Sequence, residues 1–120
     1  MGLQKFLEDW GKKVPGIVAV AVVQIDGTPV AGFSNDRDLD LMVPAAYFTE
    51  VVKSSKGSFD VTGWGDFEDV LISSNTHYIV MRMLNDDVYF GASIDAKMGN
   101  LGILRLKMKS IMKQIISFIE

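Results

Sequence analysis

Apolar positions along the chain follow two different periods, one typical of helices and one typical of strands. Near the start, four apolar side chains keep the 3.6-residue period of a helix: Leu3, Phe6, Leu7 and Trp10. This helix is expected to end near Val14, because Pro15 disfavours helical geometry in the residue before it. Residues 17–25 are apolar, and mostly β-branched, at nearly every position. That pattern predicts a central strand covered on both faces.

A hairpin and a polar loop are predicted next. Asp26-Gly27 forms a two-residue turn of the kind that needs positive φ, and residues 28–33 return as a second strand. Pro29 cannot donate to a strand ladder, so we expect this strand at an edge of the sheet. Residues 34–40 are polar and acidic, and Asp38 or Asp40 is placed to cap the helix that follows.

The predicted middle helix, residues 41–56, has too many apolar positions for a helix packed on one surface. It is expected to end before Gly57. A single packing surface needs a stripe only about 100° wide. The apolar side chains cover much more than this: Leu41, Met42, Val43, Ala45, Ala46, Tyr47, Phe48, Val51 and Val52. We therefore expect a second surface, from another copy of the chain, to cover the rest.

The remainder of the chain predicts three strands and a long helix. We expect a loop at 58–66, strands at 67–73, 77–84 and 88–94, and a helix at 97–118. Residues 101, 104, 108, 111, 115 and 118 keep the helical period with apolar side chains. The order is α-β-β-α-β-β-β-α, without an internal repeat, over a single domain at 1–120. An antiparallel sheet with helices on its faces is an α+β architecture.

Composition and charge exclude several classes of protein. The 120 residues carry 12 basic and 15 acidic side chains and no cysteine, which leaves no disulfide or zinc–thiolate site. Neither a signal peptide nor a membrane span is predicted. Residues 36–95 carry four basic and eleven acidic groups, a net charge of −7. Residues 96–120 carry five basic groups and one acidic group, a net charge of +4. The basic helix is interpreted as a solvated face, although such a face could also meet nucleic acid or anionic lipid.

Candidate catalytic and ligand-binding groups are few. His77 is the only histidine, and no nucleophile motif surrounds it, so a structural or surface role is expected. The alternating residues Asp36, Asp38 and Asp40 fail as a calcium loop, since the sixth position lacks glycine and the twelfth lacks glutamate. Gly99 and Gly102 are followed by no lysine at phosphate-loop spacing, so close backbone packing explains them better. No catalytic residue, cofactor or metal is predicted.

Three motifs together resemble the roadblock family, which includes dynein light chains and bacterial GTPase regulators. They are Val14-Pro15-Gly16-Ile17, Asp26-Gly27-Thr28-Pro29-Val30-Ala31 and Asn100-Leu101-Gly102-Ile103-Leu104-Arg105-Leu106-Lys107-Met108. The resemblance implies a five-stranded antiparallel sheet in the order 2-1-5-4-3. It also implies that the first and last helices cover one face and the middle helix the other.

The resemblance further implies how the chain associates. Family members dimerise by pairing their third strands and packing their middle helices together. By position, the implied dimer interface comprises Tyr47, Phe48, Val51, Val52, Val70, Leu71 and Ile72. Bacterial and archaeal members act with small Ras-like GTPases, and some stimulate hydrolysis by repositioning the GTPase's own groups. Arg37 is the only arginine in a predicted loop, and no arginine stands out as one that would insert into the active site of the GTPase as an arginine finger.

Three hypotheses for function remain open. The first is a homodimeric, cytoplasmic regulator or scaffold for a small Ras-like GTPase, itself not an enzyme but with possible GTPase-activating activity in trans. The second is a structural adaptor that tethers a larger complex, as dynein-associated members do. The third is a small-molecule sensor, for which the predicted core offers little polarity beyond His77, Tyr78 and Arg82. No nucleic-acid partner is predicted.

Overall fold

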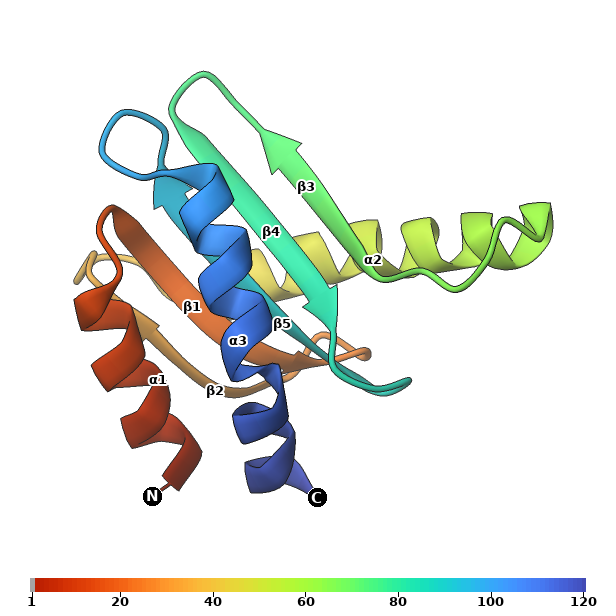
Figure 1. The fold of residues 1–120 in the computed structure, drawn as a ribbon, viewed down its shortest axis with the longest axis horizontal. Coiled ribbons are helices and arrows are strands. Elements are labelled where there is room, and N and C mark those ends of the chain that lie inside the picture. The colour runs from red at the N-terminus through yellow and green to blue at the C-terminus, as the bar shows by residue number, and fades with distance from the viewer. Residues whose placement is uncertain (1) are drawn as a thin grey trace.

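The computed structural model describes residues 2–120, and Met1 lies outside the described residues. Within this range the chain forms helices and strands in the order α-β-β-α-β-β-β-α (Figure 1). The helices are α1 (Gly2–Lys13), α2 (Met42–Thr62) and α3 (Leu101–Ile119). The strands are β1 (Ile17–Gln24), β2 (Pro29–Ser34), β3 (Asp69–Ser73), β4 (His77–Met83) and β5 (Val88–Asp95).

The strands form one antiparallel sheet in the order β2-β1-β5-β4-β3. Helices α1 and α3 lie side by side on one face, and α2 crosses the other (Figure 1). The predicted fold class, strand order and layers are confirmed. Strand β1 is central, as its unbroken apolar run predicted. Pro29 begins the edge strand β2, where its missing N–H leaves no gap in an inner ladder.

Alternate residues of the central strands supply two separate apolar cores. In β1, Val20 and Val22 face α1 and α3, whereas Ala21 and Val23 face α2. The larger core joins fully buried side chains of both helices and of strands β1, β4 and β5: Leu7, Val22, Val80, Phe90, Ile94, Met108 and Ile115. The smaller core lies under α2 and contains Val23, Ala45, Val52, Met81 and Tyr89. Because successive side chains of β1 point to opposite faces, this one strand contributes to the core on each side of the sheet.

Gly16, in the first of the three motifs, packs closely against Gly99, the residue just before the third motif. Gly16, in the loop after α1, has a φ of 81° and lies against Gly99 in the turn before α3. A Cβ on Gly16 would lie 2.6 Å from the Cα of Gly99. A Cβ on Gly99 would in turn lie 2.8 Å from Cδ1 of Ile94. Close backbone packing, as predicted, explains Gly99.

Helix α2 corrects the prediction that the middle helix ends before Gly57. It continues to Thr62, and Gly63 ends it with a φ of 67° and an N–H donated to the carbonyl of Phe59. Residues 58–62 are therefore helical and not part of a loop. A glycine within a helix costs only about 1 kcal/mol, and the ion pair of Lys56 with Asp60, one turn apart, supports this segment.

The starts of α2 and α3 refine the predicted boundaries. The N-cap of α2 is Leu41, which makes no side-chain cap bond, so neither Asp38 nor Asp40 is the cap. Asp40 lies one residue earlier and accepts the N–H of Met42 at 3.0 Å. Helix α3 begins at Leu101, later than residue 97, because Asn100 caps it by accepting the N–H of Ile103 at 3.0 Å. The preceding residues instead form a turn on the carboxylate of Asp95.

Candidate interaction site on the α2 face and the β3 edge

Helix α2 carries large apolar side chains that its own chain leaves uncovered. Met42, Val43 and Tyr47 are 66%, 53% and 75% exposed. Only Ala45, Thr49 and Val52 are buried along its length. The last turns of the helix also project beyond the sheet, past strand β3 (Figure 1). Such a strip of apolar surface is typical of a protein–protein interface.

A groove of about 350 Å³ runs between α2 and the sheet. Its walls are mainly apolar, with Pro44 and Phe48 from the helix and Ile72 and Ile79 from the strands. Gly91, which has no side chain, also lines the groove. The groove exists because α2 covers only part of this face, whereas α1 and α3 together cover the other. It therefore continues the exposed apolar strip of α2 toward strand β3.

The two edges of the sheet differ in whether they are available for pairing. At the β2 edge, the Gln4 amide donates to the carbonyl of Gly32 at 2.7 Å and accepts its N–H at 3.1 Å. These are the two bonds that a neighbouring strand would make. Pro29 removes a further donor from the same edge. At the other edge, β3 pairs only with β4 among the described residues.

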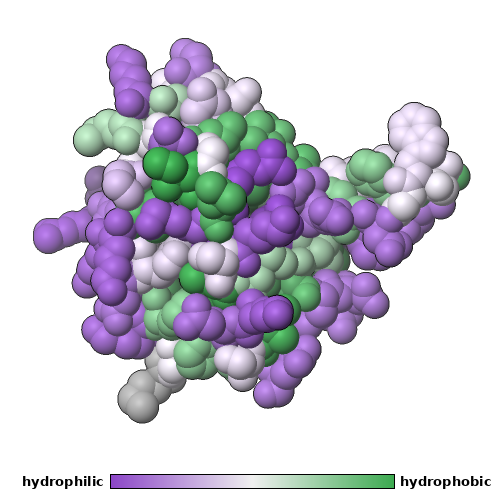
Figure 2. Space-filling model, in the orientation of Figure 1, coloured by the Kyte–Doolittle hydropathy of each residue, from purple (hydrophilic) through white to green (hydrophobic). Residues whose placement is uncertain are grey.

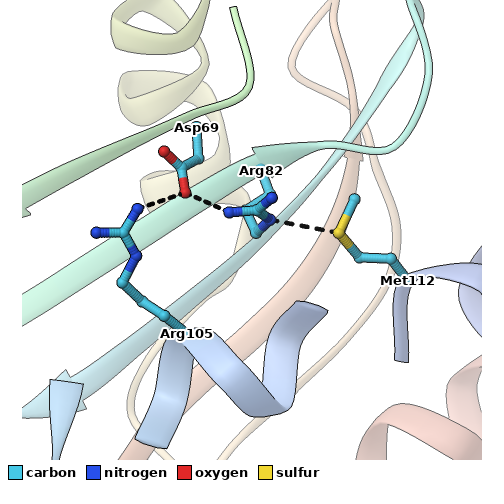
Figure 3. A network of polar contacts seen from close by, with 4 residues as sticks. All are labelled: Asp69, Arg82, Arg105 and Met112. Carbon is cyan, nitrogen blue, oxygen red and sulfur yellow. Dashed lines mark hydrogen bonds and ion pairs between the residues drawn. The ribbon is translucent and has the colours of Figure 1, made fainter. Parts of the chain in front are cut away.

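Strand β3 is held in place by a charged network between the sheet and α3 (Figure 3). Oδ2 of Asp69 on β3 accepts a close hydrogen bond from Nη1 of Arg82 on β4, and one of 2.8 Å from Nη2 of Arg105 on α3. Nε of Arg82 contacts the sulfur of Met112 at 3.3 Å. The Arg82 and Asp69 side chains are only 11% and 17% exposed. The open edge strand is therefore fixed to both its neighbours.

The residues predicted for the dimer interface take up several positions on these two features. Tyr47 is exposed, Phe48 and Val51 are half-buried, and all three lie on α2. Val52 is wholly buried in the core beneath the helix, so it supports the helix from below. On β3, Val70 and Ile72 face the α2 side, and Leu71, 36% exposed, faces the α3 side.

A buried hydrogen bond fixes the base of α2 to the sheet. The Thr49 hydroxyl donates to the carbonyl of Ala45 at 2.6 Å. Its oxygen lies 2.7 Å from the hydroxyl oxygen of Tyr89 on β5. Because the one hydroxyl hydrogen of Thr49 is already used, Tyr89 is the donor. Burial raises the pKa of the Tyr89 phenol, and the bond to Thr49 opposes this more weakly.

His77 lies at the start of β4, beside Thr76 and opposite Asp95. It is exposed, and its Nδ1 lies 2.8 Å from the hydroxyl of Thr76. Asp95 sits opposite it in the sheet, but Oδ1 of Asp95 accepts the N–H groups of Lys97 and Met98. These bonds, the Lys97 bond first, hold the pKa of Asp95 below its usual value. Among the described residues, no three histidine, cysteine, aspartate or glutamate side chains come together as metal ligands.

Comparison with known proteins bears on the fold. No family model matches the chain, and no curated protein matches it in sequence. A roadblock/LC7 domain from Streptomyces avermitilis is similar with a TM-score of 0.87 at 13% identity, over 99% of this chain and 98% of that one. MglB from Myxococcus xanthus is similar with a TM-score of 0.85 at 15% identity, over 98% of this chain and 94% of that one. MglC from Myxococcus xanthus is similar with a TM-score of 0.70 at 22% identity, over 96% of this chain and 97% of that one.

These likenesses establish the fold. The chain has the roadblock fold, as the three sequence motifs predicted, and MglB structures are among those it resembles. Within residues 2–120, no helix has both the length and the apolar character needed to cross a membrane.

Proposed function

We propose that the chain is a non-catalytic homodimeric regulator or scaffold that binds a small Ras-like GTPase. The observation that carries the proposal is the apolar strip of α2 beside an open β3 edge. A dimer through these features would cover Tyr47, Phe48 and Val51 and bring Val70, Leu71 and Ile72 to the strand junction. Val52 would support the helix from within its own chain.

The geometry of such a dimer follows from antiparallel pairing of two β3 strands. The two-fold axis that relates antiparallel neighbours stands perpendicular to the sheet, so each face of one copy continues into the same face of the other. Both α2 helices would then lie on one side, each beside the groove of its partner. All four α1 and α3 helices would lie on the opposite side. A ten-stranded sheet without an open β3 edge would result.

The proposed GTPase partner rests on the family that the motifs resemble, and MglB and MglC among the similar structures support it. We assign no catalytic residue to the chain, so any stimulation of hydrolysis would act on groups of the GTPase. Of the three arginines, Arg82 and Arg105 are engaged by Asp69 on the other side of the sheet. Arg37, in the exposed loop before α2, forms no ion pair with any described residue. A cytoplasmic location would follow from such a partner.

The test is capture of partners from the native cell lysate by the tagged full chain. GDP or a non-hydrolysable GTP analogue is added, and bound proteins are identified by mass spectrometry. Enrichment of a small GTPase with one nucleotide supports the regulator, and purified partners then enter a single-turnover hydrolysis assay. A tagged Val51→Asp variant shows whether capture needs the dimer.

The other hypotheses are outcomes of the same experiment. Capture that ignores the nucleotide, and hydrolysis that the chain leaves unchanged, would point to an adaptor that only tethers other proteins. The groove also gives the sensor hypothesis a cavity, with Ser74 and Ser93 among its few polar side chains. A metabolite that raised the melting temperature in proportion to its concentration would favour the sensor and overturn the proposal that a second α2 covers the groove.

A further inference from the structure

The helical layer formed by α1 and α3 is basic, whereas the rest of the chain is acidic. Residues 2–14 and 96–120 carry eight basic and three acidic side chains. Residues 15–95 carry four basic and twelve acidic ones. Because α1 and α3 lie side by side on the face seen in Figure 2, the positive charge is gathered on one side of the molecule.

Several of these cations are free of internal partners. Lys107, Lys109 and Lys113 on α3 are exposed and form no ion pair with any described residue. By contrast, Lys5 pairs with Asp9 at 3.2 Å, within the same helix. These three lysines of α3 are therefore available to a partner outside the chain.

Apolar side chains are exposed among these lysines. Leu106 is 70% exposed and Ile103 is 47% exposed. Seven residues make about two helical turns, so Leu106 lies on the same side of α3 as Lys113, with Lys109 between them. Met98, in the turn before α3, and Phe118, near its end, are 76% and 43% exposed. Figure 2 shows hydrophobic patches set among hydrophilic side chains on this face.

We propose that the α1–α3 face is a docking surface for an anionic lipid bilayer. Lysines around exposed leucine and isoleucine side chains are the pattern of helices that lie in a membrane interface. Lysine stems can lie along the acyl boundary while the ammonium groups reach lipid phosphates. A flat layer of two helices presents both kinds of group to a planar surface at once.

Two other partners for a basic face fit less well. Single-stranded nucleic acid needs aromatic side chains on which bases stack, and the one aromatic residue of α3, Phe118, already packs against Phe6 of α1. Protein interface cores are depleted in lysine and enriched in arginine. The one arginine of α3, Arg105, is already held by Asp69. An acidic protein partner is therefore an outcome of the test and not the proposal.

The surface belongs to a single chain and does not depend on the GTPase. Only its strength rests on the proposed homodimer, because a two-fold axis perpendicular to the sheet would place two such layers on one side and double the charge. A monomeric chain would still bind, more weakly, through the same residues. Failure of the dimer and failure of lipid binding are thus separate results.

The test is co-sedimentation of the full chain with large vesicles of phosphatidylcholine alone and of an equal mixture with phosphatidylglycerol. We expect partition only onto the anionic vesicles, weakening as salt is raised. Reversing Lys109 and Lys113 to Glu should lower the partition coefficient by about tenfold or more. The matched control reverses Arg37 and Lys53, also exposed, with the same change in net charge and little expected effect.

A second pair of variants tests the apolar contribution. Leu106→Ser should lower the partition coefficient by a similar factor at low and at high salt, because apolar insertion is not screened, whereas the effect of the lysine reversals should shrink as salt is raised. Val61→Ser, at an exposed site on α2, is its control. Circular dichroism and size exclusion verify that each variant keeps its fold and oligomeric state. Absence of binding to anionic vesicles at low salt, or equal losses in the two charge-reversal variants, would overturn the proposal. So would capture of an acidic protein by this face without lipid binding.

Discussion

The side-chain amide of Gln4 makes both hydrogen bonds to the backbone of Gly32, one as donor and one as acceptor. A residue of α1 thereby occupies the place of a neighbouring strand at the β2 edge. Natural sheets protect their edges in ways that differ from one edge to the other. Here one edge is closed from within the chain, and the other, β3, is left for pairing.

Replacing Gln4 by Ala should open the β2 edge. Both backbone groups of Gly32 would then face water, and two partly exposed hydrogen bonds would be lost, at a cost of about 1 kcal/mol in the free energy of unfolding. We expect new association that grows with protein concentration, measured by sedimentation velocity. Gln114→Ala, at an exposed site on α3, is the control. Identical sedimentation of the two variants would show that the amide does not protect the edge.

Substituting Val51 by Asp should separate the proposed dimer. A charge at this half-buried site would lie unpaired between two α2 helices, which a dimer tolerates poorly. We expect a monomer by size exclusion with light scattering, with circular dichroism unchanged. Val30→Asp places the same charge on β2, at the opposite edge of the sheet, where the side chain is 44% exposed, and should leave the mass unchanged. A dimer of unchanged affinity in Val51→Asp would place the interface elsewhere.

Removing the carboxylate of Asp69 should loosen strand β3. In Asp69→Ala, Arg82 would keep its charge at a mostly buried site without a partner, which costs about 3 kcal/mol. Amide hydrogen exchange should rise along β3 before it rises along β1. Asp60→Ala breaks an exposed pair within α2 and should cost less than about 1 kcal/mol. Equal protection of β3 in both variants would contradict the role given to the network.

The strand order and the layers could be predicted because local patterns carry them. The unbroken apolar run of β1 marks a central strand, and Pro29 marks an edge. The end of α2 was predicted wrongly because Gly57 has the signature of a helix stop. What decides between Gly57 and Gly63 is the backbone conformation, and only Gly63 adopts positive φ. Where α2 ends also depends on bonds between successive turns of the helix, such as the ion pair of Lys56 with Asp60. Composition does not reveal such bonds.

The candidate site was predictable only in part. The excess of apolar residues on α2 signalled a covered surface, but the sequence did not show that Val52 alone of the predicted set is wholly buried. The roles of Gln4 and Asp69 could not be predicted, because each bonds to a residue far away in the chain. Gln4 bonds to Gly32, 28 residues later, and Asp69 bonds to Arg105, 36 residues later. In the sequence pattern, a polar helix residue that makes such a contact cannot be told from one that only faces water. Such contacts appear only once the fold brings them together.

The hydrogen bond between Tyr89 and Thr49 should make stability depend on alkaline pH. Burial raises the pKa of Tyr89 in the folded chain above its value in the unfolded chain, near 10. The folded state then holds this proton where the unfolded state has lost it. The contribution of Tyr89 is therefore complete below pH 10 and declines as the pH rises through the folded pKa.

Tyr89→Phe isolates this effect. The variant should lose about 1 kcal/mol of stability at neutral pH, because Thr49 loses the hydroxyl that donates to it. Above pH 10 its free energy of unfolding should fall less steeply than that of the natural chain, as measured by urea denaturation at several pH values. Tyr47→Phe, at a site 75% exposed, is the matched control. A parallel decline in the natural chain and in Tyr89→Phe would show that the phenol titrates alike in the folded and unfolded states.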